Sequence, residues 1–232
     1  MKYLIWNLWS FILSQNVLDY KKQLIFSFGI FVLLIIVRKI LRNIKIKLKG
    51  IAGEKKVKRI LSKFEKNGYV VFNDLMLPLY DGTTQIDHVI VGPHGVTAIE
   101  TKNYAGNIYG SGDNKYWLQI LGRARNEFYN PVKQNETHVR TLKYLLQKEG
   151  LHYVGVENLV VFTSKKSKIH LNEELPVLKL KMVKKWFENQ KNNRIKVDKV
   201  ALAIEKYKIE DKSKRIEHVK NIKKNHKKRV FN

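Results

Sequence analysis

The sequence contains no cysteine and only four prolines among its 232 residues, and acidic residues are outnumbered by basic ones, 20 to 45. The absence of cysteine excludes disulfides, thiol catalysis and cysteine-ligated metals, and it fits a reducing compartment. The shortage of acidic residues leaves a formal net charge of +25, which favours nucleic acid or an anionic membrane surface as a partner. The length suits one modest globular domain with appendages.

A long uncharged run lies near the N-terminus, from Leu24 to Val37, between Lys21-Lys22 and Arg38-Lys39. As a helix it would be roughly 21 Å long, and the flanking basic side chains can reach the interface and cover most of the shortfall. It predicts a single transmembrane helix over about 23–39 rather than a signal peptide or a core helix. The basic residues that follow predict a cytoplasmic location for the rest of the chain.

The apolar run at residues 3–18 is interrupted by polar residues and carries aromatic residues that suit the membrane interface. It either lies along the membrane surface or forms a first span. We therefore divide the chain into a membrane-anchoring region at 1–49, a globular domain at 50–165, and peripheral helices with a basic tail at 166–232.

The globular domain is expected to begin with a helix that ends before Gly68, since Val57, Leu61 and Phe64 recur at helical spacing. Glu54 falls on the inward stripe of this helix. Its carboxylate either has a functional role or simply stabilises the first helical turn through the helix dipole.

A β-hairpin is predicted for residues 83–103, with a turn at Gly92–Gly95 that makes the numbers of paired residues sum to 187. Asp87 then falls opposite Glu100, and Gln85 falls opposite Lys102, all on one face. Two carboxylates this close repel each other unless a cation lies between them. The alternative is a solvent-facing strand, but valines and an alanine share the face, so we predict a functional site.

These residues resemble the NERD (nuclease-related domain) family, a branch of the PD-(D/E)xK nuclease superfamily. The resemblance covers roughly residues 50–164 and rests on these segments: GEKKVKRIL, QIDHVIVGPHGVTAIETKNYAG, YW, NPVKQNETHV and NLVVF. It implies an α/β, restriction-endonuclease-like core of helix, antiparallel strands, helix and strand.

The resemblance also implies a role for each of six residues. Asp87 and Glu100 correspond to the metal-binding carboxylates and Lys102 to the catalytic lysine. Glu54 matches the glutamate of the family's helix, and Gln85 and Gln134 match its glutamines. The resemblance implies that all six residues take part in catalysis. Residue 88, directly after Asp87, is a histidine, as is usual in this branch.

The chemistry of these residues also favours metal-dependent hydrolysis of phosphodiester bonds. Phosphodiester hydrolysis uses a metal held by hard oxygen ligands, which favours Mg²⁺ or Mn²⁺ at Asp87 and Glu100. Lys102 could position the attacking water or stabilise charge on the phosphate. The histidines at 88, 94 and 138 have no recognisable zinc spacing, and we expect a structural role for His88.

Downstream, residues 106–120 predict two short strands, with Trp117 either in the core or available for base stacking. Asn130 and Pro131 predict the start of a helix that ends at Gly150, with Gln134 and His138 on one side. That side faces either the hairpin or solvent. A further strand is expected near residues 157–164, then helices near 182–190 and 199–208, and a basic tail from residue 206.

The sequence thus predicts a membrane-anchored, cytoplasm-facing, Mg²⁺-dependent nuclease that hydrolyses nucleic acid, with DNA favoured over RNA. The alternative is a catalytically silent module that binds nucleic acid or serves as a membrane scaffold. The scaffold would leave the charges of the hairpin unexplained.

Overall fold

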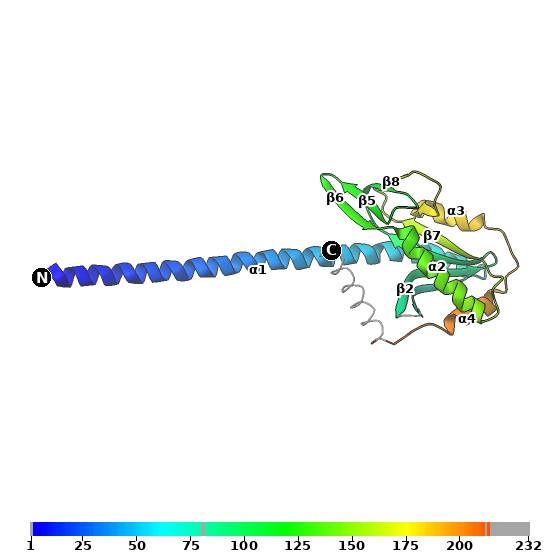
Figure 1. Cartoon of the computed structure of the whole chain (residues 1–232), viewed down its shortest axis with the longest axis horizontal. Helices are drawn as coiled ribbons and strands as arrows, with labels where there is room; N and C mark the ends of the chain where they lie inside the picture. Colours follow the sequence, from blue (N-terminus) through cyan, green and yellow to red (C-terminus); the bar gives the residue numbers. More distant parts are fainter. Residues whose placement is uncertain (1, 80–81, 212, 214–232) are drawn as a thin grey trace. The chain divides into compact units, whose positions relative to one another are not determined.

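The computed structural model describes residues 2–79, 82–211 and 213, and the chain divides into two compact units between Lys49 and Gly50. Helix α1 (Lys2–Glu65) is continuous and supplies residues to both units (Figure 1). The uncharged run and the first helix of the globular domain, which we predicted as separate helices, are parts of this one element.

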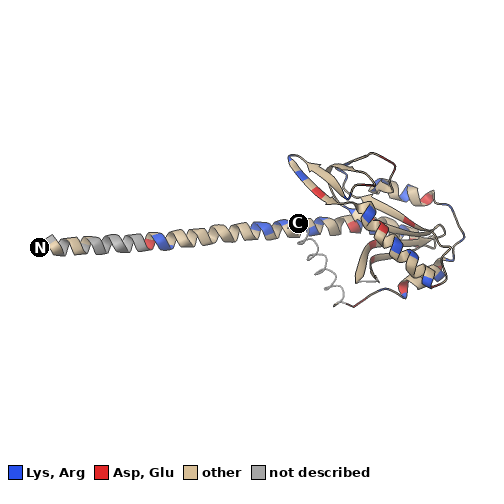
Figure 2. Cartoon of the chain, viewed as in Figure 1, with Lys and Arg blue, Asp and Glu red and all other residues tan. Residues whose placement is uncertain are grey.

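The N-terminal unit consists of helix α1 up to Lys49. Its stretch from residue 19 onward contains a window with a mean hydropathy of 2.5, none of it buried by protein. In Figure 2 this uncharged stretch of α1 is drawn in tan, between ribbon segments coloured for Lys and Arg. Large apolar side chains such as Phe26 and Phe28 are exposed on it. By length and composition, this helix could span a membrane.

The second unit is built on a mixed five-stranded sheet in the order β1-β2-β3-β7-β9. Its strands are β1 (Val70–Pro78), β2 (Thr83–Gly92), β3 (Gly95–Lys102), β7 (Val156–Phe162) and β9 (Val177–Lys179). The pairs β1–β2 and β2–β3 are antiparallel, whereas β3–β7 and β7–β9 are parallel. A parallel pair needs a crossover connection, and α2 (Pro131–Lys148) lies in the one between β3 and β7.

Both faces of this sheet are covered, which explains the nearly continuous apolar sequence of β3. On one face, Val89 and Ala98 pack with residues of α2 and α4 (Val197–Glu205). On the other, Ile90 and Ile99 pack with residues 57–64 of α1 and with α3 (Val183–Glu188). The 3-10 helix η1 (Leu180–Met182) precedes α3.

A second sheet of four strands has the order β6-β5-β4-β8. It contains β4 (Gly106–Gly110), β5 (Tyr116–Leu121), β6 (Ala124–Tyr129) and β8 (Ser167–Leu171). The two predicted strands, β4 and β5, are confirmed as an antiparallel pair. Trp117 is in the core, 1% exposed and stacked on Phe162, so the base-stacking alternative is wrong.

The predicted caps of α2 are confirmed. The side chain of Asn130 accepts hydrogen bonds from the N–H groups of Val132 and Lys133, Pro131 occupies the first turn, and Gly150 follows the end with φ +70°. These features satisfy backbone groups that a helix end leaves unpaired. They fix where α2 begins, and therefore where Gln134 lies.

The C-terminal segment is more firmly held than its composition indicated. Helix α4 buries Val200 and Ile204 in the core. Beyond it, Tyr207 donates a hydrogen bond to Glu149, and the N–H of Ile209 donates to the carbonyl of Met76. The packed chain therefore continues past residue 206, where we had expected the tail to begin. The basic residues at 214–232 lie outside the described part of the chain.

Candidate active site at the open end of the hairpin

The predicted register of the hairpin is confirmed at its turn end. The recorded pairs run from Gly92↔Gly95 to His88↔Ile99, and their numbers sum to 187. Among these described residues the ladder stops there, so Asp87 and Glu100 lie just beyond it. We call the end of the hairpin beyond His88 and Ile99 its open end, and the charged residues lie there.

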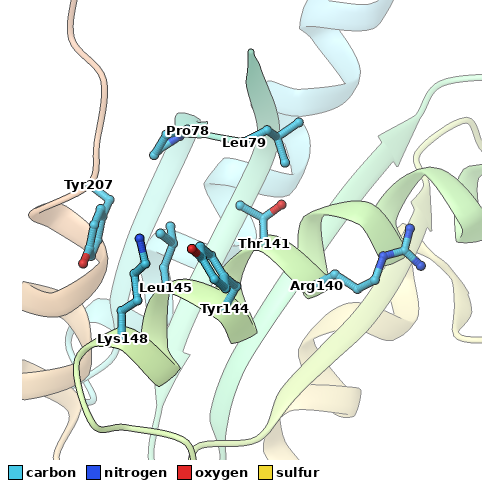
Figure 3. Close-up of a pocket in the computed structure, with 8 residues that line it drawn as sticks. All are labelled: Pro78, Leu79, Arg140, Thr141, Tyr144, Leu145, Lys148 and Tyr207. Carbon is cyan, nitrogen blue, oxygen red and sulfur yellow. The ribbon is translucent and has the colours of Figure 1, made fainter. Parts of the chain in front are cut away.

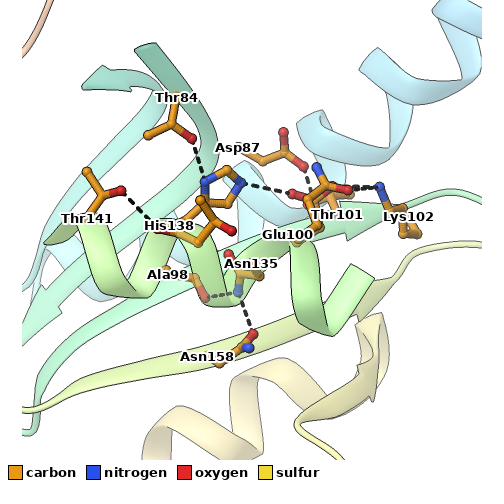
Figure 4. Close-up of polar contacts among 12 residues, drawn as sticks. Thr84, Asp87, Ala98, Glu100, Thr101, Lys102, Asn135, His138, Thr141 and Asn158 are labelled. Carbon is orange, nitrogen blue, oxygen red and sulfur yellow. Dashed lines mark hydrogen bonds and ion pairs between the residues drawn. The ribbon is translucent and has the colours of Figure 1, made fainter. Parts of the chain in front are cut away.

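Where the ladder between β2 and β3 ends, the side chain of Asp87 takes the place of a backbone acceptor. The backbone carbonyl of Lys102 accepts a hydrogen bond from the N–H of Thr163 at 2.9 Å. Even-numbered residues of β3 therefore turn their backbone N–H and C=O groups toward β7. The N–H of Thr101 therefore points toward β2, and it donates to Oδ2 of Asp87 at 2.8 Å. This bond positions the Asp87 carboxylate beside the end of β3 (Figure 4).

Glu100, Lys102 and Gln134 form a connected group. Nζ of Lys102 donates to Oε1 of Glu100 at 2.6 Å and to Oε1 of Gln134 at 3.1 Å. Glu100 is 3% exposed, and the side chain of Lys102 is 16% exposed. We had left open whether the side of α2 that carries Gln134 faces the hairpin or solvent. In the structure it faces the hairpin.

His138 approaches Glu100 from the next turn of α2. Its Nε2 lies 3.6 Å from Oε2 of Glu100, too far for a hydrogen bond, and its Nδ1 shares a 2.8 Å hydrogen bond with the hydroxyl of Thr84. Oε2 of Glu100 is buried without a hydrogen-bond partner. Among the described residues this oxygen has no donor, so its full capacity to accept a hydrogen bond or bind a cation is unused.

Asn135 attaches α2 to the sheet. Its amide donates to the carbonyl of Ala98 at 2.8 Å and to the side chain of Asn158 at 2.7 Å. We predicted no role for Asn135, Asn158 or Thr84. The sequence offered one signal for Asn135, its position next to Gln134. A buried amide needs a specific hydrogen-bond partner, and the sequence does not reveal which residue that is.

Glu54 and Gln85 lie at the edge of the cluster rather than within it. Burial, and then the charges of Asp74 and Glu100, raise the pKa of Glu54, which is half-buried on α1. Gln85 donates to Oδ1 of Asp74 at 2.6 Å instead of facing Lys102. Asp74, a residue that the sequence analysis missed, has φ +55°, an uncommon value away from glycine.

A close approach explains the glycine before Glu54. A Cβ at Gly53 would lie 2.8 Å from Oγ1 of Thr163 and 2.9 Å from Cβ of Asn103. Only glycine allows α1 to come this near the ends of β3 and β7. This contact brings the Glu54 carboxylate toward the hairpin.

The pKa values of the two central carboxyls move in opposite directions. Burial, and then the charge of Glu100, raise the pKa of Asp87 well above its ordinary value. Burial would also raise the pKa of Glu100, but Lys102 and His138 outweigh it and lower that pKa. For Lys102, burial lowers the pKa and the Glu100 carboxylate raises it, with a raised pKa as the result. Glu100 and Lys102 therefore form an ion pair, beside a carboxyl at Asp87 that is costly to ionise.

The two buried histidines near the hairpin are removed from this cluster. His88 shares a 2.8 Å hydrogen bond with the side chain of Asn73, which suits the structural role that we predicted. His94, in the turn, shares one of 2.9 Å with the hydroxyl of Thr97. Burial lowers the pKa of each to about 4, so both rings are neutral at pH 7.

Comparison with known proteins supports the resemblance. Residues 49–163 match the model of the nuclease-related domain family, NERD, and this part of the chain is a NERD domain. The family belongs to the PD-(D/E)xK-like nuclease group. A nuclease-related function is therefore assigned at the level of the family.

A relative of similar sequence is an uncharacterized protein of Bacillus anthracis, which is 40% identical over 127 residues. The aligned region covers 54% of this chain and 60% of that relative. No solved structure matches the chain.

Proposed function

We propose that this protein is a metal-dependent nuclease that hydrolyses phosphodiester bonds in nucleic acid. The observation that supports it most directly is the group formed by Asp87, Glu100, Lys102 and Gln134 at the open end of the hairpin. A lysine held between a carboxylate and an amide, next to a second carboxylate, presents positive charge and oxygen ligands at one place. Phosphoryl transfer requires both.

The oxygen atoms of Asp87 and Glu100 fit a hard divalent cation, Mg²⁺ or Mn²⁺. Among the described residues no three Asp, Glu or His side chains converge in a metal-binding arrangement. A pair of carboxylates suits Mg²⁺, which keeps several waters and also takes phosphate oxygens as ligands. The unpartnered Oε2 of Glu100 and the raised pKa of Asp87 are what such a cation would relieve. When bound, the cation would polarise the phosphate and lower the pKa of a bound water.

The residues of the chain would divide the remaining tasks. Lys102, charged because of Glu100, would donate to a phosphate oxygen or to the attacking water. Gln134 would hold its ammonium group on the side of α2. His138, itself oriented by Thr84, would face the second oxygen of Glu100 and limit its rotation. Glu54 and Gln85 would act at the edge, where a water or the substrate backbone could reach them.

We also infer a restriction-endonuclease-like core for residues 50–165. The order of elements, with the end of α1 first, then β1 to β3, α2 and β7, follows the order that this core requires. Residues 166–232 would then be an addition to the core. DNA is our preferred substrate over RNA.

The proposal includes a location, with residues 1–49 as a single-pass anchor in the cell membrane and the NERD domain in the cytoplasm. It is supported by the exposed apolar stretch of α1 and by the basic residues that follow it. The full-length protein should stay with membranes after high-salt and carbonate washes, because apolar burial resists both. Release by salt alone would show that only its basic surface binds the bilayer.

The activity is tested with the full-length chain in a mild detergent. It should cleave DNA when Mg²⁺ or Mn²⁺ is added and should be silent in EDTA, with single- and double-stranded DNA and RNA compared. Binding of nucleic acid without cleavage under any metal condition would favour the catalytically silent module instead. Neither binding nor cleavage would favour the membrane scaffold.

A further inference from the structure

A pocket of about 520 Å³ lies beside the C-terminal half of α2, apart from the cluster of Asp87, Glu100 and Lys102 (Figure 3). Apolar side chains of Pro78, Leu79 and Leu145 contribute to its lining. The polar side chains around it belong to Arg140, Thr141, Tyr144, Lys148 and Tyr207. Aromatic rings and cations beside apolar surface are the combination that binds an unpaired base together with its phosphate.

The aromatic rings of the pocket are accessible and held in place. Tyr144 is 56% exposed, and Nζ of Lys148 lies 4.7 Å from the centre of its ring. The hydroxyl of Tyr207 donates to Glu149 at 2.7 Å, and Lys206 pairs with the same carboxylate at 2.7 Å. The Glu149 carboxylate is therefore already engaged by two partners, so it repels a phosphate less.

The pocket lies at the end of a stripe along α2. Lys133, Thr137, Arg140, Tyr144 and Lys148 follow one another at intervals of four, three, four and four residues, which places them on one flank of the helix. The stripe has three cations, and the exposed Glu136 of α2 lies beside it, three residues after Lys133 and four before Arg140. Figure 2 shows basic residues spaced along α2. Such a line of positive charge complements the backbone of a polyanion.

The stripe starts at the candidate active site. Lys133 is adjacent to Gln134, which binds Lys102. Tyr144 comes ten residues after Gln134, about 15 Å along the helix axis. At about 3.4 Å per stacked nucleotide, this corresponds to roughly four nucleotides. A short single strand could reach from the cluster to the pocket.

We propose that the stripe and the pocket bind single-stranded nucleic acid, with an unpaired base stacked on Tyr144 and phosphates on Arg140 and Lys148. The inference rests on the proposed nuclease function and specifies the form of its substrate. A duplex could offer phosphates to the stripe, but its bases are paired and stacked and cannot enter the pocket. Selective loss of single-strand binding is therefore the signature of this site.

The test measures binding by the full-length protein in detergent, with EDTA present so that nothing is cleaved. Short labelled DNA and RNA, each single- and double-stranded, serve as probes. Tyr144→Ala should weaken single-strand binding about tenfold, the cost of one lost stacking contact, and should leave duplex binding unchanged. Tyr144→Phe keeps the ring and should bind normally. Tyr153→Ala, which removes a tyrosine 59% exposed elsewhere, is the matched control.

The cations are tested in the same assay. Lys148→Ala and Arg140→Ala should each weaken single-strand binding and lower its salt dependence by about one unit of slope. Lys143→Ala removes an exposed lysine of the same helix outside the pocket and should have little effect. These variants decide the matter if Tyr144→Ala does not fold.

Unchanged single-strand binding by Tyr144→Ala, or equal losses for single strands and duplexes, would overturn the inference. If the protein cleaves DNA with metal while either result holds, the proposed function survives and only the pocket assignment fails. If Tyr144-dependent single-strand binding is found in a protein that cleaves nothing, the pocket survives and the nuclease proposal fails.

Discussion

The two ends of the β2–β3 hairpin differ sharply although the same two strands form both. At the turn end, regular backbone pairs join residues 88–92 to 95–99, and the face toward α2 carries apolar side chains. At the open end the ladder stops and side chains make the connections, from Asp87 to Thr101 and from Lys102 to Glu100 and Gln134. The turn end is held by its backbone ladder and apolar packing, whereas the open end is held by bonds between charged and polar side chains.

The largest expected effect concerns the carboxylates of the open end. Asp87→Asn or Glu100→Gln should lower cleavage by at least about 10²-fold while the domain stays folded. Mg²⁺ or Mn²⁺ should raise the melting temperature of the wild type by mass action and raise it much less in these variants. The measurements are cleavage rates and melting curves with and without metal.

The matched control is Glu157→Gln, which alters an exposed carboxylate of β7 opposite the turn end of β3. It should cleave like the wild type. Wild-type cleavage by Asp87→Asn and Glu100→Gln would remove the catalytic assignment. Unfolding of both would mean that the charges serve a buried ion network.

The second prediction separates Lys102 from the metal ligands. Lys102→Met should abolish cleavage and should also destabilise the metal-free protein by about 3 kcal/mol, because Glu100 loses its buried partner. Metal should still raise the melting temperature, since lysine is not a ligand. Melting curves of the variant with and without Mg²⁺ test this, and the absence of any metal response would place Lys102 in the metal site itself.

A third prediction tests the turn end. Gly95 has φ +130°, and a Cβ there would lie 2.6 Å from the carbonyl oxygen of Gly155. Gly95→Ala should therefore destabilise the protein by about 2–3 kcal/mol. Below its melting temperature, the folded variant should cleave normally, because the open end is unchanged.

Gly122→Ala is the control for that substitution, since Gly122 has φ +61° but no atom within 4 Å of the added Cβ. It should cost only about 1 kcal/mol. If the two variants melt alike, the close contact with Gly155 does not contribute to the requirement for glycine.

The smallest effect is a pH dependence that arises from the turn. Burial beside Tyr69 and Phe187 lowers the pKa of His94 to about 4, whereas the unfolded chain has a value near 6.5. The unfolded state binds more protons between these values, so this contribution to stability is complete above pH 6.5 and is lost as the pH falls toward 4. Between pH 7 and pH 5, His94→Gln should flatten that fall by about 2 kcal/mol, measured as melting temperature against pH.

His88, whose pKa is also about 4, should keep part of the slope in that variant. A slope that is the same in His94→Gln and the wild type would show that the turn histidine does not titrate with unfolding.

Patterns that depend on near neighbours were predictable. The register of the turn end, the Asn130 and Gly150 ends of α2 and the burial of Trp117 follow from local rules, and the structure has them. Strands β6, β8 and β9 were not predicted. Each is six residues long or shorter, and what makes them strands is a neighbouring strand that supplies hydrogen bonds.

The candidate site, too, was predictable in part. Spacing in the hairpin placed Asp87, Glu100 and Lys102 near one another, and the helix period placed Gln134 and His138 on one side of α2. Spacing also predicted that Gln85 would face Lys102, which the structure does not show, because Gln85 binds Asp74 instead. Asp74 holds this amide from a position with φ +55°, and no pattern in the sequence signals that backbone angle.

The sequence by itself determined the apolar stretch of α1, the turn of the hairpin and the residue types of the site. Each depends on properties of the chain within a few residues, such as hydrophobicity, glycine conformation and side-chain period. Only the tertiary structure decided that Gln134 holds Lys102, that His138 faces Glu100, and that Gly53 brings Glu54 toward both. These contacts join residues that are distant in sequence, and the packing of α1 and α2 against the sheet selects them.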